Sequence, residues 1–318
     1  ALIVNPNNRE EVADAIAAAL SMPEEEKTHR VSGMQRRLRR NDVFQWSSSF
    51  IEKLSNTKTI DEEYSFKKLI KANLQHMLDD FRESKSRLML LDYDGTLVPF
   101  EDRPENAVPD AELMELLTEL SADPRNNIVI ISGRNHEFLE KYFSGMPLTL
   151  IAEHGAWLKF HGDEWKPVKT MDTQWKNTIR PILESYCDRT PGTFIEEKEY
   201  SLTWHYRRSD AELASIRAME LKGNLLHMIA NHNLGIMEGN KVLEIKSLEI
   251  TKGKIADFLL SSKQYEFIFA IGDDVTDEDL FAVIPEPGYT VKVRYGPSKA
   301  RFIVQDTRAG RQVLKQIT

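Results

Sequence analysis

The sequence predicts an α/β fold built around a parallel sheet, and three aliphatic runs carry that prediction. Residues 88–91, 127–131 and 267–271 are short and almost wholly apolar, a pattern typical of strands buried on both faces of a parallel sheet. Each run ends in small or charged residues. Because open α/β sheets bind ligands beyond the carboxyl ends of their strands, the three endings are expected to form one site.

The first run is followed by two aspartates one residue apart, Asp92 and Asp94, and then by Gly95. Side chains alternate along a strand, so the two carboxylates emerge on the same side. Carboxylates held this close repel each other unless a cation or a shared proton lies between them. Asp-Gly is also a common turn pair, so this motif taken alone predicts only a turn.

The other two runs deliver groups that complement these carboxylates. Ser132 and Arg134 follow the second run, and Asp273 and Asp277 follow the third. Chance produces one polar ending readily. Three endings with complementary chemistry favour a functional site over three unrelated turns.

Lys252 adds a positive charge to this set. It precedes Gly253 at the start of a helix-like segment, after the strand-like residues 242–245. An ammonium group beside the free amides of a helix start suits an anion, whereas a lone lysine here is more simply interpreted as a solvated surface residue. The order and spacing of the four motifs resemble those of the haloacid dehalogenase-like phosphatases. The matching segments are residues 92–96, 132–134, 252–253 and 272–277.

A narrower resemblance, to the trehalose-6-phosphate phosphatase family, extends from about residue 69 to the carboxyl terminus. It rests on segments of an inserted domain as well as of the core, namely residues 152–156, 194–198, 204–207 and 243–246. The resemblance implies a Rossmann-like parallel sheet of the haloacid dehalogenase type with an inserted α/β cap domain. We therefore expect a core made of residues 58–157 and 241–318 and a cap made of residues 158–240.

The resemblance also implies a mechanism. Asp92 would attack phosphorus and become an aspartyl phosphate, and Asp94 would protonate the leaving sugar oxygen and later deprotonate water. Ser132 and Lys252 would hold the phosphoryl oxygens. Mg²⁺, which prefers oxygen ligands and keeps several waters, would be bound by Asp92, the backbone carbonyl of Asp94, and Asp273.

Substrate contacts are implied around this centre. Arg134 would contact substrate or tie the second strand to its neighbours, and His154 would face substrate at the hinge or be structural. Asp277 is expected to brace Lys252 or metal-bound water rather than to bind metal. Charged side chains of the cap would hydrogen-bond the sugar distal to the phosphate, because such groups suit a polyol; without the family, a solvated strand edge is the simpler interpretation. These cap contacts are Glu196, Lys198 and Glu244.

Residues 1–57 form a separate segment. The apolar spacing over residues 12–20 predicts a helix, and a second helical stretch is expected over residues 35–40. The segment resembles the last part of a glycosyltransferase of the trehalose-6-phosphate synthase family, without its nucleotide-sugar and acceptor sites. We expect the chain to be the carboxyl-terminal portion of a longer protein, covalently fused to a synthase domain, with a linker near residues 55–59.

The composition limits partners and location. The 318 residues include 42 basic and 50 acidic side chains, a formal net charge of -8. Nucleic-acid binding usually needs a broad basic surface, so the basic run at residues 36–40 is interpreted as a solvated helix face. No apolar stretch is long enough to span a bilayer, and the single cysteine, Cys187, suits a reducing compartment. We expect a cytoplasmic protein that binds neither nucleic acid nor membrane.

The expected function is Mg²⁺-dependent hydrolysis of trehalose 6-phosphate to trehalose and phosphate. Other sugar phosphatases, such as the sucrose-phosphate type, and phosphosugar mutases share the core motifs and are alternatives. A catalytically silent regulatory domain of a trehalose synthase is a third. Silent domains usually lose a nucleophile or a metal ligand, and here Asp92, Asp94 and Asp273 are all present.

Overall fold

The computed structural model describes residues 9–40, 47, 67–101, 103–229 and 232–317. The chain divides into two compact units, residues 1–65 and residues 66–318. In the first unit, the two expected helices are present as α1 (Arg9–Ser21) and α2 (Glu24–Arg40). The expected linker near residues 55–59 lies outside the described residues.

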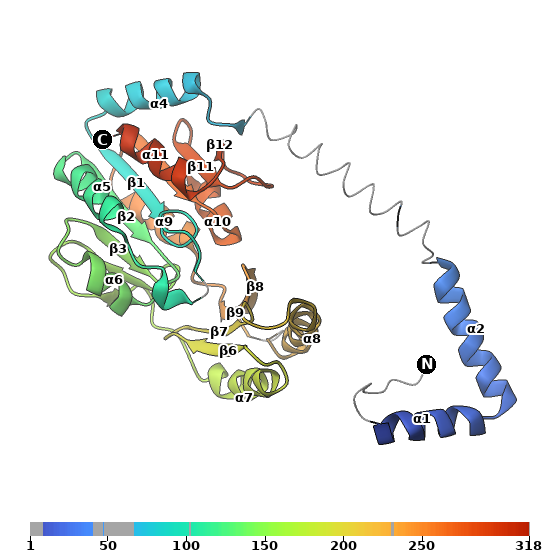
Figure 1. Ribbon diagram of the computed structural model, residues 1–318. Helices are drawn as coiled ribbons and strands as arrows, with labels where there is room; N and C mark the ends of the chain where they lie inside the picture. Colours follow the sequence, from blue (N-terminus) through green and yellow to red (C-terminus); the bar gives the residue numbers. More distant parts are fainter. Residues whose placement is uncertain (1–8, 41–46, 48–66, 102, 230–231, 318) are drawn as a thin grey trace. The chain divides into compact units, whose positions relative to one another are not determined.

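The second unit is built on an eight-stranded sheet whose strand order is β12-β11-β10-β1-β2-β3-β4-β5 (Figure 1). The neighbours from β12 to β3 pair in parallel, and β4 and β5 are added in antiparallel fashion. This confirms the predicted α/β fold with a mostly parallel sheet. The strands are β1 (Arg87–Asp92), β2 (Asn126–Ile131), β3 (Thr149–Ala152), β4 (Trp157–Lys159), β5 (Lys166–Pro167), β10 (Phe267–Gly272), β11 (Tyr289–Val293) and β12 (Phe302–Val304).

The three aliphatic runs form the adjacent strands β10, β1 and β2. Their register places the polar residues that follow each strand at the same edge of the sheet. In β1, Leu91 pairs with Ile271 of β10, and Asp92 pairs with Ile131 of β2. The residues that follow β2 and β10 therefore leave the sheet beside Asp92. The predicted convergence of the three strand ends is confirmed.

Helices cover both faces of this sheet, as expected for fully buried strands. Alternate residues of β1 belong to different hydrophobic clusters: Met89 and Leu91 pack on one face, and Leu88 and Leu90 on the other. The first face is covered by α4 (Lys71–Glu83), α5 (Ala111–Ala122), α6 (His136–Phe143) and α11 (Thr307–Ile317), and the second by α9 (Lys252–Ser262) and α10 (Val275–Val283). A short 3₁₀ helix, η2 (Pro104–Asn106), follows β1.

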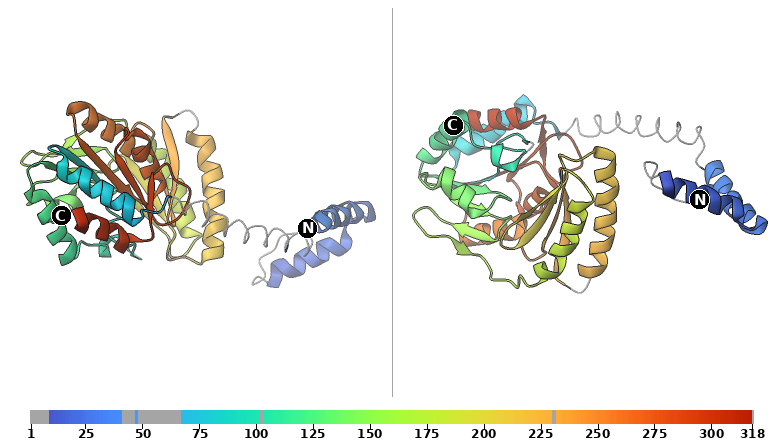
Figure 2. Two further views of the ribbon diagram at one scale, coloured as in Figure 1. Left: turned by 90° about the horizontal axis from the view of Figure 1, so that it is seen from above. Right: turned by 60° about the horizontal axis from the view of Figure 1, so that its bottom comes forward.

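A second, antiparallel sheet forms the cap, with the strand order β6-β7-β9-β8. Its helices α7 (Trp175–Asp188) and α8 (Ala211–Ile229) lie on the face away from the core (Figures 1 and 2). Leu202 and Trp204 of β7 pack beneath these helices, so Thr203 and His205 on the same strand face the core. The strands are β6 (Phe194–Glu197), β7 (Ser201–His205), β8 (Leu234–Gly239) and β9 (Val242–Ser247).

The cap therefore has different limits from those expected. β9 pairs with β7 and β8 of the cap sheet, so a boundary after residue 240 is wrong. β4 and β5 extend the core sheet, so the core continues past residue 157. The apolar pattern of residues 242–245 fits a strand in either sheet. The sequence alone therefore does not distinguish a turn at Asn240 inside the cap from a boundary between the cap and the core. Within the described ranges, no helix combines the length and the apolar character needed to cross a membrane.

Candidate active site

Lys252 and two aspartates form a buried ion-pair cluster at the ends of the central strands. Asp92 closes β1 and is 4% exposed, and Lys252 opens α9 and is 2% exposed. The ammonium nitrogen Nζ of Lys252 donates to Oδ1 of Asp92 at 2.5 Å and to Oδ1 of Asp277 at 2.7 Å. The structure therefore places this lysine as the counter-charge of the acidic cluster.

Asp277 holds both the lysine and the loop that follows β10. Its Oδ2 accepts the backbone N–H groups of Asp273 at 2.9 Å and of Asp274 at 3.0 Å, and it completes a capping box at the start of α10. Both of its carboxylate oxygens are thus already hydrogen-bonded. The expected bracing of Lys252 by Asp277 is confirmed.

Crowding of the carboxylates shifts their acidity. Burial, with the negative charges of Asp277 and Asp273 added, raises the pKa of Asp92 well above its usual value despite the opposing effect of Lys252. Burial and Asp277 raise the pKa of Asp273 to about 7, against the pull of Arg294, which donates to Oδ2 of Asp273. Burial disfavours the charged form of Lys252, but Asp277 and Asp92 outweigh it and raise its pKa. A further cation would relieve the remaining repulsion.

The cluster has the chemistry of a divalent-cation site. Carboxylate oxygens of Asp92, Asp273 and Asp277 lie within 4.8 Å of one another. Oδ2 of Asp92 is buried and has no hydrogen-bond partner among the described residues, so one oxygen of this carboxylate remains free to bind a ligand. Gly95 has φ +80°, and a Cβ atom there would lie 2.5 Å from Oδ2 of Asp273. The backbone thus approaches the cluster as closely as only glycine allows, and these residues fit a cation with oxygen ligands.

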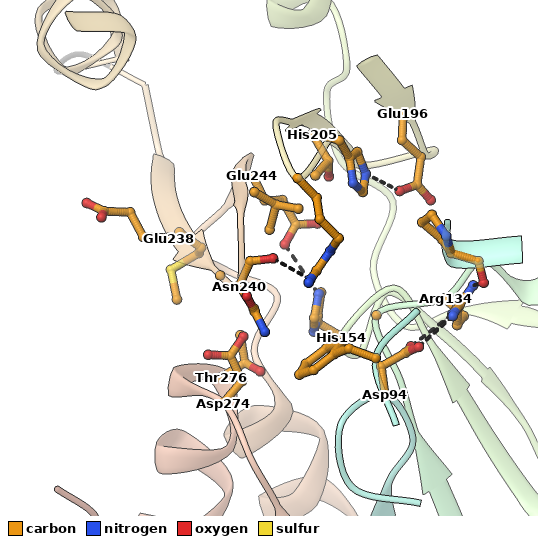
Figure 3. Close-up of a pocket in the computed structure, with 18 of the residues that line it drawn as sticks. Asp94, Arg134, His154, Glu196, His205, Glu238, Asn240, Glu244, Asp274 and Thr276 are labelled. Carbon is orange, nitrogen blue, oxygen red and sulfur yellow. Dashed lines mark hydrogen bonds and ion pairs between the residues drawn. The ribbon is translucent and has the colours of Figure 1, made fainter. Parts of the chain in front are cut away.

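Asp94, two residues after Asp92, lines a cavity and is bound by Arg134 (Figure 3). Nε of Arg134 donates to Oδ2 of Asp94 at 2.8 Å, and Nη2 donates to Oδ1 at 2.5 Å. Nη1 donates to the carbonyl of Pro104 at 2.5 Å, and the guanidinium lies 4.6 Å from the ring centroid of Phe138. Arg134 therefore ties the end of β2 to the chain that follows β1, while it also lines the cavity.

Ser132 follows β2, as the sequence predicts, but its hydroxyl is fully buried. Its Oγ accepts the backbone N–H of Arg134 at 3.0 Å, and its backbone carbonyl accepts the N–H of His154 at 2.9 Å. Ser132 is absent from the described residues that line the cavity. In this structure it orders the loop that carries Arg134.

The cavity lies between the core and the cap and brings the remaining predicted residues together (Figure 3). The core contributes Asp94, Arg134 and His154, and the cap contributes Glu196, Lys198 and Glu244. Residues that follow β1, β2 and β3 thus meet residues of β6 and β9 and the turn after β6, although they are far apart in the sequence. The arrangement presents carboxylate and ammonium groups to a single occupant.

The cap side chains are held by ion pairs. Nε2 of His205 lies 2.7 Å from Oε2 of Glu196, and Nζ of Lys198 lies 3.7 Å from Oε1 of the same carboxylate. Burial opposes ionisation of Glu196, but Lys198 and His205 outweigh it and lower its pKa to about 2. Burial also opposes the charged form of Lys198, yet the carboxylates of Glu196 and Glu244 raise its pKa. Both groups are therefore charged at neutral pH.

His154 joins the core to the cap. Its Nε2 lies 3.3 Å from Oε2 of Glu244. Burial and the positive charge of Lys246 lower the pKa of His154 to about 4, against the effect of Glu244, so the ring is neutral at pH 7. Burial opposes ionisation of Glu244, but the contact with His154 and the charge of Lys198 lower its pKa. Oε1 of Glu244 and Nδ1 of His154 are buried and have no hydrogen-bond partner among the residues that the structure describes.

Two cavity residues on β7, Thr203 and His205, were not predicted from the sequence as site residues. The alternation of residues 201–207 predicts this strand, and strand parity puts Thr203 and His205 on the face opposite Trp204. The signal was therefore present, but the sequence did not show which face would meet the core. Phe194 also lines the cavity, and its ring stacks on that of His205 with centroids 4.5 Å apart.

Comparisons with known proteins identify the family of the chain. A sequence model of the trehalose-phosphatase family matches residues 90–307, and one of glycosyltransferase family 20 matches residues 1–56. A bifunctional trehalose-6-phosphate synthase/phosphatase of Thermoproteus tenax is 41% identical over 319 residues, which cover 100% of this chain and 44% of that protein. A trehalose-phosphatase of Saccharomyces cerevisiae is 34% identical over 304 residues, which cover 88% of this chain and 34% of that protein.

Solved structures give the same result. The C-terminal domain of the C. albicans trehalose-6-phosphate phosphatase superposes with a TM-score of 0.71 at 33% identity, covering 77% of this chain and 96% of that chain. The chain spans less than half the length of these two relatives. The family match, which includes every motif of the acidic cluster, nevertheless extends over more than half of the chain. This chain belongs to the trehalose-phosphatase family.

Proposed function

We propose that this chain is a Mg²⁺-dependent phosphatase that hydrolyses trehalose 6-phosphate to trehalose and phosphate through an aspartyl phosphate on Asp92. The observation that carries the proposal is the cavity itself. It is lined by Asp94 and Asp274, which stand two residues and one residue along the chain from the clustered Asp92 and Asp273, and by charged cap residues that suit a sugar. The relatives named trehalose-phosphatase support the identity of that sugar.

In the first half-reaction, a carboxylate oxygen of Asp92 bonds to phosphorus as the bond from phosphorus to the sugar oxygen breaks. Asp94 gives its proton to that leaving oxygen. Arg134, which binds Asp94 in this structure, is the natural partner of the incoming phosphate. If Arg134 left Asp94 and bound the phosphate instead, the carboxyl group of Asp94 would be able to carry the proton. In the second half-reaction Asp94 takes a proton from the attacking water.

The residues that would hold Mg²⁺ are Asp92, the backbone carbonyl of Asp94, and Asp273. Oδ2 of Asp92, to which no described residue hydrogen-bonds, supports this choice, and the occupied oxygens of Asp277 argue against that residue as a ligand. When bound, the cation would supply charge neutralisation, so that an ionised Asp92 could meet a phosphate dianion. Lys252 and Ser132 would hold the phosphoryl oxygens, where charge must be stabilised during transfer.

Selectivity is assigned to the cap. Glu196, Lys198 and Glu244 are charged and face the cavity, and charge-assisted hydrogen bonds to hydroxyl groups are the stronger ones. The buried Oε1 of Glu244 and Nδ1 of His154, which have no partner in the described part of the chain, would be satisfied by hydroxyl groups of the distal sugar. A phosphate ester without the distal sugar ring would leave these two polar atoms unpaired, so its binding is disfavoured.

We also propose covalent fusion to a trehalose-6-phosphate synthase domain, supported by the match of residues 1–56 to glycosyltransferase family 20 and by the bifunctional relative. A cytoplasmic location is part of the same proposal. Its support is the single cysteine, Cys187, which excludes an intrachain disulfide within this sequence.

Phosphate release from trehalose 6-phosphate, with Mg²⁺ and with EDTA, tests the function. Sucrose 6-phosphate and p-nitrophenyl phosphate serve as comparison substrates. We expect efficient release from trehalose 6-phosphate that EDTA abolishes and Mg²⁺ restores. Release that EDTA leaves intact would rule out the metal assignment, and faster turnover of sucrose 6-phosphate would rule out the substrate.

A further inference from the structure

Glu153 and His154 form an unusual pair in the turn between β3 and β4. Their φ angles are 48° and 59°, in the left-handed region, although neither residue is glycine. Such conformations are strained and persist only where the surroundings fix them. The pair lies where the core sheet meets the cap, and both side chains reach across that junction.

The backbone of Glu153 is fixed to the core and its side chain to the cap. Its N–H donates to the carbonyl of Arg134 at 2.9 Å. Its carboxylate, on a residue that is 5% exposed, accepts the backbone N–H groups of Glu199 at 3.3 Å and of Tyr200 at 3.2 Å. One residue therefore links the loop that carries Arg134 to the turn between β6 and β7.

That turn carries a residue of the cavity. Lys198, which immediately precedes Glu199, has its N–H bound to the carbonyl of Ser201 at 3.1 Å, and its own carbonyl accepts Nζ of Lys176. The charge of Glu153 also acts on Lys198. His154, the next residue of the core, contacts Glu244 on β9. Two consecutive core residues thus hold the two cap segments that carry the sugar contacts.

We propose that Glu153 is a positioning residue that fixes the Lys198 turn of the cap over the acidic cluster and thereby helps to select a disaccharide phosphate over small phosphate esters. This rests on the proposed function. Glu153 is absent from the described residues that line the cavity, so it acts through Lys198 and not on the substrate. A small displacement of a binding group far from the chemistry can cost up to about 100-fold in rate.

The test compares Glu153→Ala and Glu153→Gln with a control, Glu164→Gln, which removes a like charge from the exposed β4–β5 hairpin. The readouts are KM and kcat for trehalose 6-phosphate and for p-nitrophenyl phosphate. For Glu153→Ala we expect KM for trehalose 6-phosphate to rise on the order of 10–100-fold, with kcat/KM for p-nitrophenyl phosphate changed by less than about 2-fold. Glu153→Gln should fall between Glu153→Ala and the wild type, because one of the two accepting oxygens is kept and the other is replaced by an NH2 group, which cannot accept.

Hydrogen exchange supplies a readout that does not depend on the substrate. In Glu153→Ala the amides of Glu199 and Tyr200 should lose protection, while those of β7 and β9 keep theirs. Unchanged protection of these two amides, or equal losses of kcat/KM on both substrates in Glu153→Gln, would overturn the proposal. If the wild type fails to hydrolyse trehalose 6-phosphate while the exchange result holds, the proposed substrate fails and the positioning role stands.

Discussion

Replacing Lys252 by methionine is predicted to destabilise the fold and to stop turnover. The substitution keeps most of the side-chain volume but removes the only ammonium that the described residues place on both Asp92 and Asp277. Removing one partner of a buried ion pair costs about 3–5 kcal/mol, because a charge is left uncompensated. For a domain of this size each kcal/mol is roughly 2–4 °C in Tm, so Tm should fall by roughly 6–20 °C at pH 7.

The destabilisation of Lys252→Met should depend on pH in a defined direction. Burial raises the pKa of Asp92 already in the presence of the lysine, and without it the carboxylate binds a proton more tightly still. A group whose pKa is raised by folding gains stability as pH falls. The difference in Tm between the variant and the wild type should therefore shrink from pH 7 to pH 5.

Calorimetry in EDTA at both pH values measures this, with Lys254→Met as the matched control. Lys254 is two residues along the same helix, and its ammonium donates to the carbonyl of Leu248 at an exposed position. We expect the control to retain its Tm within about 2 °C, in line with a surface substitution. A Lys252→Met variant as stable as the control, or one whose deficit grows on acidification, would refute the reasoning about the buried cluster.

Three further predictions concern the sugar contacts, the acid stability and the metal. Glu196→Ala should reduce kcat/KM for trehalose 6-phosphate far more than for p-nitrophenyl phosphate, because it removes a charged cap contact; equal losses would remove it from the sugar site. The pKa of His154 is about 4 in the fold against 6.5 for the free side chain, so the unfolded chain binds a proton that the folded chain does not. Acidification from pH 6.5 to 4 should therefore lower the free energy of unfolding by up to about 3 kcal/mol. Urea unfolding of His154→Gln should show a flatter pH dependence, and an equally steep one would contradict the buried neutral ring. Asp273→Asn should weaken Mg²⁺ binding in calorimetric titrations at least about 10-fold, because loss of a group that only supports a metal ligand already costs that much; unaltered affinity would place the cation elsewhere.

The sequence was sufficient to predict the centre of the fold and of the site. Strand alternation and apolar runs are local signals, and they place Asp92, Ser132 and Asp273 at the ends of neighbouring strands without any knowledge of long-range contacts. Lys252 was predictable as the counter-charge only in combination with the acidic motifs, because a lone lysine at a helix start is more simply interpreted as a solvated surface residue. The structure shows in addition that Asp277 is a hydrogen-bond partner of that lysine.

The cap was less predictable because its pairing is non-local. β9 joins the cap sheet through β7, which lies about forty residues earlier in the chain, and no local pattern distinguishes that pairing from one in the core. The link from Glu153 to Glu199 and Tyr200 likewise depends on how two sheets meet. His205 was placed on the correct strand, but only the packing of Trp204 beneath the helices shows that His205 faces the cavity.

Chemical trapping of the phosphorylated residue tests the central claim most directly. The enzyme is mixed with trehalose 6-phosphate and Mg²⁺, quenched in acid within the first turnover, and treated with borohydride, which reduces an acyl phosphate to an alcohol. Mass spectrometry of the peptide that contains β1 should then show homoserine at position 92, and none in an Asp92→Asn sample treated in parallel. Phosphate release at the wild-type rate with no reducible intermediate at position 92 would contradict transfer of the phosphoryl group onto Asp92.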